Sequence, residues 1–347
     1  MSNAFSENGP FRINPDKTLK IHDYSWNTFS DLLYIDQPLG TGYSHVDDIN
    51  RIPKTQEKVA EDLYEFFLNF LNEYPKYSGR PLYFVGQSYA GHYIPYIIPY
   101  FISQDNPSLN IKGVAIGNGS TDRSIQNKEF PEFAYSKGLV SEFKYIISLI
   151  GFNYCSFFCK LEWQSYAEYF CQMPYQMILG VTEKQFSPYD VRLPCVNPPW
   201  CLNNTLIEEV GGSNAFKKAL GVEGRPWEDC NFTVYYAMRD DYYKSYKEGI
   251  SSMIRSGLEV IIYYGIEDYI CNYKGGYALI QNLEWEGTPH LINSPWRDWY
   301  EGGELKATYQ RYQKMTYINV YDAGHMVSTE QPEFALSMLW KLIYGFD

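Results

Sequence analysis

Residues 81–95 place a serine where nucleophilic chemistry would need one. The apolar and aromatic run 81–85 leads into Gly86-Gln87-Ser88-Tyr89-Ala90-Gly91, and no turn signal follows until Pro95. This order is typical of a strand, a tight elbow and a helix with the serine at the apex, where the hydroxyl is exposed and helical N–H groups face the group under attack. Small residues flank the serine because larger side chains would collide with the neighbouring strand or helix. The pattern is short, so an ordinary strand-to-helix turn is the alternative interpretation.

A carboxylate and a histidine follow the serine in an order suited to a catalytic triad. Of the five histidines, only His290 and His325 lie well downstream. His325 follows the apolar run 317–320 in a Gly-His turn, whereas His290 has no strand before it and is predicted to be a loop residue. Asp268 lies in the loop after the buried-strand pattern 258–265. Each residue alone fits a capped turn or a surface group, but three strand ends in one order favour a triad.

Motifs along nearly the whole chain resemble those of the serine carboxypeptidase family, close to its carboxypeptidase Y and carboxypeptidase D types. The resemblance implies an α/β-hydrolase fold, in which helices flank a mostly parallel sheet and a helical cap is inserted. The matching segments are Glu7–Phe11, Tyr24–Asn27, Tyr34–Ser44, Gly86–Gly91, Ile116–Gly119, Asp190–Arg192, Lys218–Val222, Asp268–Asn272 and Ala323–Val327.

The resemblance also implies roles for individual residues. Ser88, Asp268 and His325 match the nucleophile, the orienting acid and the general base. The backbone N–H of Tyr89 matches one donor of the oxyanion hole. The pocket for the residue before the scissile bond is matched by Cys271 and Met326.

Two residues, Glu7 and Gln87, match family positions that bind the C-terminal carboxylate of the substrate. The family usually has glutamate at the second position, and carboxyls that face a carboxylate hold protons and favour acidic pH. An amide cannot ionise, and its NH₂ group always donates. We therefore hypothesise that Gln87 still binds the carboxylate and extends activity toward neutral pH; neutral drift is the alternative.

Family members carry an earlier segment, ending in W-x-N-G-G-P-G-C-S-S, that this sequence does not contain. By resemblance it supplies a second oxyanion donor, an asparagine for the terminal carboxylate, and a strand between 32–36 and 82–85. Loss of one oxyanion donor typically costs about 10²–10³ in turnover, and a missing central strand leaves backbone groups unpaired. We therefore expect N-terminal strands to be missing, from an incomplete chain or a rearranged sheet, and activity to be impaired.

Hydrophobic patterning predicts a discontinuous core, residues 1–120 and 251–347, with a cap inserted at 121–250. Strands are expected at 32–36, 82–85, 112–116, 258–264 and 316–321, with a loop-rich stretch before the last. Helical periodicity covers 55–74 and 332–344. A further helix is expected at 89–103, kinked or broken by Pro95 and Pro99.

Charge and targeting signals exclude some classes of partner. The 347 residues carry a net charge of −12, which argues against nucleic acid and against an anionic membrane surface. No run of about 18 apolar residues is present, so no membrane span is predicted. Residues 1–11 are polar and lack the pattern of a signal peptide.

The cysteines and the sequons nonetheless indicate secretory ancestry. Asn203 and Asn231 begin glycosylation sequons, as does Asn118, which follows a core strand. By family resemblance the protein belongs to the secretory pathway, the vacuole or lysosome, or the extracellular space.

Zinc is a weak interpretation of the cluster Cys155, Cys159 and Cys171, because paired ligand spacings and nearby histidines are lacking; its disulfide pairing stays open. By resemblance, Cys195 and Cys201 form a small disulfide loop and Cys271 is a free thiol. Cys230 matches a family cysteine whose disulfide partner is absent from this sequence.

Together these residues predict a serine-type carboxypeptidase that acts on peptide or protein C-termini through an acyl-enzyme, with no metal or organic cofactor. Three alternatives remain. The first is an acyltransferase on the same fold, and the second is a non-catalytic derivative that kept the pocket. The third is an ester or lipid hydrolase, against which the terminal-carboxylate motifs argue.

Overall fold

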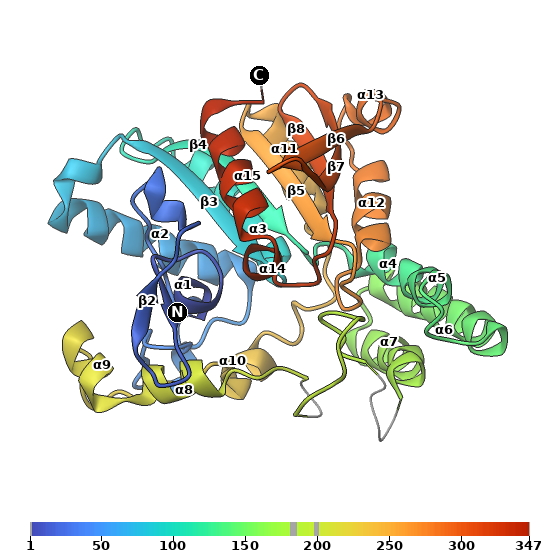
Figure 1. Cartoon of the computed structure of the whole chain (residues 1–347), viewed down its shortest axis with the longest axis horizontal. Coiled ribbons are helices and arrows are strands. Elements are labelled where there is room, and N and C mark those ends of the chain that lie inside the picture. The colour runs from blue at the N-terminus through green and yellow to red at the C-terminus, as the bar shows by residue number, and fades with distance from the viewer. Residues whose placement is uncertain (1, 181–185, 198–200, 347) are drawn as a thin grey trace.

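A computed structural model describes residues 2–180, 186–197 and 201–346 (Figure 1). Six strands form one sheet in the order β3-β4-β5-β8-β7-β6. The first four in this order are parallel: β3 (Pro81–Gln87), β4 (Asn110–Gly117), β5 (Glu259–Gly265) and β8 (Met315–Val320). An antiparallel pair, β7 (Glu304–Tyr312) and β6 (Arg297–Glu301), completes the sheet. A separate antiparallel ribbon joins β1 (Phe11–Ile13) to β2 (Leu19–Ile21).

Alternate residues of the parallel strands point to opposite faces of the sheet, and both faces are buried. On one face Val114 and Ile262 belong to a core cluster built with four long helices. These are α2 (Gln56–Glu73), α3 (Ala90–Ser103), α11 (Lys247–Arg255) and α12 (Tyr273–Gln281), followed by the short α13 (Thr288–Ile292). On the other face Ala115 and Ile261 pack with the C-terminal α15 (Pro332–Tyr344), which crosses in front of the sheet in Figure 1 and follows α14 (Val327–Glu330). This layered, mostly parallel architecture agrees with the predicted fold class.

Most predicted core elements are confirmed to within about two residues at each end. The helix α3 has nearly the predicted bounds but differs in one respect. It is continuous through Pro95 and Pro99, where the sequence predicts a kink or a break. An interior proline costs about 3 kcal/mol. Four side chains of α3 are nearly inaccessible in the core, namely Ile94, Ile97, Ile98 and Phe101. Burial of each contributes about 1.5–3 kcal/mol, so together they contribute about 6–12 kcal/mol against about 6 kcal/mol for the two prolines. Packing therefore outweighs the two prolines.

Two predictions about the sheet are wrong. Residues 32–36 form no strand. Among the described residues β3 pairs only with β4, so no strand lies on its other side. The apolar pattern of residues 32–36 reflects packing instead, since Leu32 and Ile35 contact the clusters on opposite faces of the sheet. The stretch predicted as loop-rich contains the β6–β7 hairpin, whose turn Gly302-Gly303 has positive φ at both residues, a hairpin signal that the sequence analysis overlooked.

The predicted cap, residues 121–250, contributes no described residue to the six-stranded sheet. Figure 1 shows its first helices projecting to one side of the sheet and its later ones below, near α1 (Ser2–Ser6) and β2. The division at 121–250 stays a prediction, and α11, which starts inside it, packs in the core. In the described part of the chain, no helix is long and apolar enough to cross a bilayer. The cap helices are α4 (Arg123–Gln126), α5 (Phe130–Ser136), α6 (Glu142–Lys160), α7 (Gln164–Leu179), α8 (Thr205–Gly212), α9 (Asn214–Leu220) and α10 (Phe232–Ala237).

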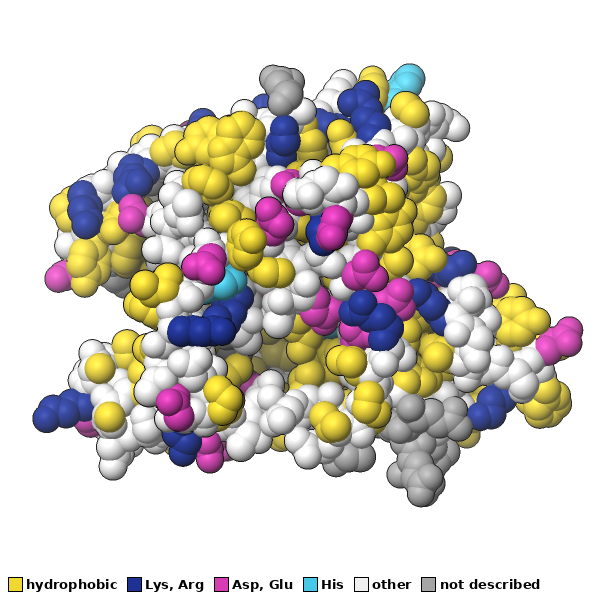
Figure 2. All heavy atoms as spheres, in the orientation of Figure 1, with side chains coloured by type: hydrophobic (Ala, Val, Ile, Leu, Met, Phe, Trp, Pro, Cys, Tyr) yellow, Lys and Arg dark blue, Asp and Glu magenta, His cyan; other side chains and the backbone are white. Residues whose placement is uncertain are grey.

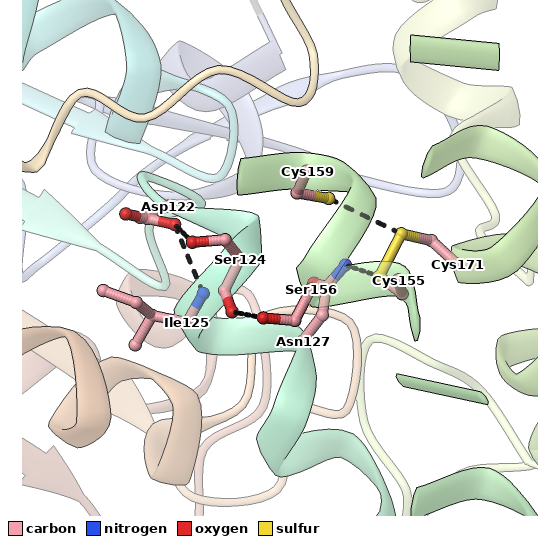
Figure 3. Close-up of a disulfide and its surroundings, with 8 residues drawn as sticks. All are labelled: Asp122, Ser124, Ile125, Asn127, Cys155, Ser156, Cys159 and Cys171. Carbon is pink, nitrogen blue, oxygen red and sulfur yellow. Dashed lines mark hydrogen bonds between the residues drawn. A yellow bond between two sulfur atoms is a disulfide. The ribbon is translucent and has the colours of Figure 1, made fainter. Parts of the chain in front are cut away.

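A disulfide between Cys155 and Cys171 joins α6 to α7 (Figure 3). It settles the pairing that the sequence left open and uses two of the three thiols that a zinc ion would need. Cys159, one turn from Cys155 on α6, remains a buried thiol with its sulfur 3.7 Å from that of Cys171. The second disulfide, Cys195–Cys201, is present as expected. Cys271 and Cys230 are free cysteines, the latter exposed.

This cysteine arrangement predicts unequal effects of removing the two partners of the α6–α7 disulfide. Cys171→Ala should lower the free energy of unfolding by about 3 kcal/mol, the typical contribution of a loop of this size, here with a sequence separation of 16. Cys155→Ala should cost clearly less, because Cys159 can pair with Cys171 instead. Denaturant unfolding and peptide mapping of the oxidised variants measure this. A Cys155→Ala, Cys159→Ala double variant is the control and should match Cys171→Ala; equal losses in both single variants would contradict the prediction.

Candidate active site

Ser88 forms the elbow between β3 and α3, with a left-handed backbone (φ +60°) that is strained for any residue except glycine. Its carbonyl accepts a hydrogen bond from the N–H of Ser120 at 3.0 Å. The small neighbours have a steric cause, as predicted. A Cβ added to Gly91 would lie 2.5 Å from the Ser120 oxygen, and one on Gly86 would lie 2.5 Å from the Ala90 Cβ.

The carboxyl ends of β4, β5 and β8 bring three further side chains together. His325 Nδ1 lies 2.7 Å from Asp268 Oδ2, and both side chains are buried. Asn118 donates its side-chain N–H to the same carboxylate oxygen at 2.8 Å. The backbone N–H of Cys271 donates to the other oxygen at 3.3 Å. The carboxylate is therefore oriented from two sides and can fix the tilt of the imidazole.

Electrostatics at His325 favour a strong base. Burial acts to lower the pKa of the imidazole, but the charge and the hydrogen bond of Asp268 outweigh it and raise the pKa above its usual 6.5. With Nδ1 held by Asp268, Nε2 is the nitrogen left to accept a proton.

The Ser88 hydroxyl lies close enough to the Cys271 thiol to act on the pKa of that thiol, which it lowers. In the described part of the chain it makes no hydrogen bond to His325, and such contacts are often loose in enzymes without substrate. Burial, assisted by the charge of Asp268, raises the pKa of Cys271 far above that of a free thiol. Ligand atoms of Cys271, Asp268 and His325 lie within 4.8 Å of one another. Two of these atoms, His325 Nδ1 and Asp268 Oδ2, are already paired with each other at 2.7 Å, an arrangement that suits proton transfer.

The two predicted carboxylate-binding residues both lie near His325. The side-chain NH₂ of Gln87 donates to the backbone carbonyl of His325. Burial raises the pKa of Glu7 to about 7, although the charges of His325 and Arg12 act to lower it. The chain reaches this place because its N-terminal turn is anchored to α14, where Thr329 donates to the Ser6 carbonyl at 2.7 Å.

The remaining predicted residues also lie around the elbow. Tyr89 directly precedes α3, and its phenol donates to Asp241 at 3.0 Å. Met326 is partly buried between His325 and α14. Figure 2 shows the molecule hollowed near the middle of this face, below the sheet-bearing core. The catalytic and binding roles of all eight residues stay predictions.

Asn118 is a site residue that the sequence analysis missed, since it was considered only as a sequon and as part of a matching segment, with no role in the site. It is fully buried and bonded to Asp268, so a glycan there is incompatible with this structure. Its position directly after β4, beside the other strand ends, was the available signal.

A second missed feature is a brace formed by residues 187–192, within the predicted cap, which contacts the loops of both Asp268 and His325. The Pro188 carbonyl accepts hydrogen bonds from two backbone N–H groups directly after Asp268, at 3.1 and 2.9 Å. The Tyr189 carbonyl accepts the N–H of His325 at 2.7 Å. Arg192 in the same segment binds Asp190 and Glu330. The brace thus ties the loop of Asp268 to the loop of His325.

The family model "Serine carboxypeptidase" matches residues 1–345. The chain is 32% identical to a "serine carboxypeptidase-like" protein of Oryza sativa, over 98% of this chain and 81% of that one. It is 34% identical to "serine carboxypeptidase S10 family member 1" of Dictyostelium discoideum, over 98% and 82%. Its fold is similar to the crystal structure of a prohormone-processing carboxypeptidase from Saccharomyces cerevisiae, with a TM-score of 0.88 and 24% identity over 99% of this chain and 80% of that one. From its α/β-hydrolase fold and these matches, the chain belongs to the serine carboxypeptidase family.

Proposed function

We propose that this protein is a serine-type carboxypeptidase that releases C-terminal residues from peptides through an acyl-enzyme. The observation that carries the proposal is the buried contact of 2.7 Å between His325 and Asp268 beside the Ser88 elbow. Ser88 attacks the last peptide carbonyl, and His325 accepts its proton. Asp268 holds the imidazole and stabilises its charged form. The Tyr89 N–H donates to the developing oxyanion.

Selection of a free C-terminus is assigned to Gln87 and Glu7. The amide NH₂ of Gln87 donates at every pH. Glu7, with a pKa of about 7, is mostly protonated in acidic solution and can donate to a carboxylate without repelling it. Water, activated by His325, then releases the acyl group, and no step needs a metal or an organic cofactor.

The test is hydrolysis of an N-blocked dipeptide with a free C-terminus beside its C-terminal amide, with products identified by mass spectrometry. We expect release of the last amino acid from the free acid and much slower turnover of the amide. Adding an alcohol acceptor, with a glucose ester as alternative donor, separates hydrolysis from acyl transfer. A dominant ester product, or equal turnover of acid and amide, would contradict the proposal.

The pH range of activity should depend on Gln87. A carboxylate at position 87 would face the His325 carbonyl that Gln87 now binds, and two acceptors repel unless the acid holds a proton. Gln87→Glu should therefore shift the kcat/KM profile toward acidic pH and reduce activity at neutral pH by about tenfold, the scale of one lost hydrogen bond to a charged group. Gln87→Met, which has no donor, is the control and should lose activity at every pH; superimposable profiles of Gln87→Glu and the parent enzyme would refute the role.

We also infer a secretory, vacuolar or extracellular location. The two disulfides support it, since such bonds persist in oxidising compartments. Asn203 is exposed and fits a glycan acceptor. Glycosidase treatment of the native protein, followed by peptide mapping, checks modification at this site.

A further inference from the structure

Arg123 is a half-buried cation without a carboxylate partner among the described residues. It begins α4, and its Nε is buried without a hydrogen bond. Its guanidinium carbon lies 3.5 Å from the centre of the Tyr242 ring, a cation–π contact that fixes the plane of the group. The side chains whose charges act most on Arg123 are tyrosines and cysteines.

This cation lines a small pocket beside the nucleophile. The pocket walls include Ser120, Phe130, Ile270 and Cys271. Ser120, which lines the pocket, donates its backbone N–H to the Ser88 carbonyl at 3.0 Å, so the pocket opens next to the residue predicted to attack. Burial is the largest influence on the pKa of Cys271, and the positive charge of Arg123 opposes it. The field of Arg123 thus reaches the place where the acyl side of a substrate would lie.

Three nearby acids already use their oxygens elsewhere. Asp122 accepts from the Ser124 hydroxyl and the Ile125 N–H, as Figure 3 shows, and also from Ser245. The other two are engaged by several donors each: Asp241 by Gln56, Tyr89 and Tyr246, and Asp268 by His325, Asn118 and the Cys271 N–H. None of the three forms an ion pair with Arg123.

An unpaired charge in a poorly hydrated place costs free energy. A carboxylate is the group that best recovers it, because two oxygens match the guanidinium fork. That carboxylate is distinct from the substrate's C-terminus, which is assigned to Glu7 and Gln87, because neither of these residues lines the pocket of Arg123. We propose that Arg123 selects peptides with aspartate or glutamate immediately before the scissile bond. This inference rests on the proposed carboxypeptidase activity.

The test compares N-blocked dipeptides that differ only in the penultimate residue: Glu-Leu, Gln-Leu and Lys-Leu. At pH 6–7 we expect kcat/KM for Glu-Leu to exceed that for Gln-Leu by about tenfold or more, the scale of a charge-assisted hydrogen bond, and Lys-Leu to be poorest. Arg123→Gln should bring the Glu-to-Gln ratio close to one, and Arg123→Lys should restore part of it. A ratio near one in the parent enzyme, or an unchanged ratio in Arg123→Gln, would overturn the inference.

A binding measurement separates this inference from the proposed function. Calorimetry with N-blocked glutamate and N-blocked glutamine uses Ser88→Ala protein, with and without Arg123→Gln, and thermal melting confirms that both are folded. Binding that is selective for the glutamate compound and depends on Arg123 would support the acidic subsite. If the parent enzyme at the same time turned over no dipeptide, the carboxypeptidase proposal would be refuted while the subsite stood. Equal binding of both compounds would refute the subsite.

Discussion

Asp268→Asn should lower kcat by about 10⁴-fold while the protein remains folded, the size of effect known for removing this charge from a triad. An amide at this position can present a donor to His325 Nδ1, which favours the tautomer whose Nε2 already carries a proton. The buried imidazolium that forms during attack would also lose its counter-charge. Steady-state kinetics with a blocked dipeptide, beside thermal melting, measure the effect.

The same variant has a pH signature. Asp268 raises the pKa of His325 against the effect of burial, so its neutralisation should move the acid limb of kcat/KM to lower pH. Asn118→Ser is the matched control, because it keeps the carboxylate and removes one hydrogen bond to it. We expect a loss of about tenfold for this control, the scale of a single bond to a charged group. Wild-type turnover in Asp268→Asn would show that the pair is only structural.

Glu7→Ala should lower kcat/KM for free-acid peptides by about 10–100-fold below pH 6, because it removes a charge-assisted hydrogen bond to the terminal carboxylate. Turnover of the matching peptide amide should change little. Parallel kinetics on the two substrates measure this, and equal losses on acid and amide would indicate damage to the fold instead of a lost contact.

Glu7→Gln supplies the pH control for this residue. With a pKa of about 7, Glu7 donates while protonated and repels the substrate once ionised, so parent activity on free acids should fall as the pH rises above 7. Glutamine cannot ionise and should flatten that decline. An identical decline in Glu7→Gln would assign it to another group.

How far the sequence predicts this protein depends on whether a feature is local. The strand-loop patterns that carry Asp268 and His325 are local, and the structure brings the two side chains into contact. The strand predicted at 32–36 failed because an apolar alternation cannot reveal whether a backbone partner lies alongside. Only Asp190–Arg192 were noted as a motif from the sequence. The bonds that Pro188 and Tyr189 make to two distant loops depend on the tertiary fold.

Arg123 also shows that a residue's tertiary contacts cannot be predicted from its neighbours in the sequence. Nothing in its neighbourhood in the sequence distinguishes it from a solvated arginine at the start of a helix. Its significance comes from the Tyr242 ring that it contacts and from the pocket that it shares with Cys271. Both of these residues lie more than a hundred positions away in the sequence.

Labelling with a fluorophosphonate probe tests most directly whether Ser88, His325 and Asp268 act as one catalytic unit. The account predicts a single adduct on the Ser88 peptide of the folded protein, no adduct in Ser88→Ala, and far slower labelling in His325→Ala. Folded protein that resists the probe, or a His325→Ala variant that reacts as fast as the parent, would contradict it.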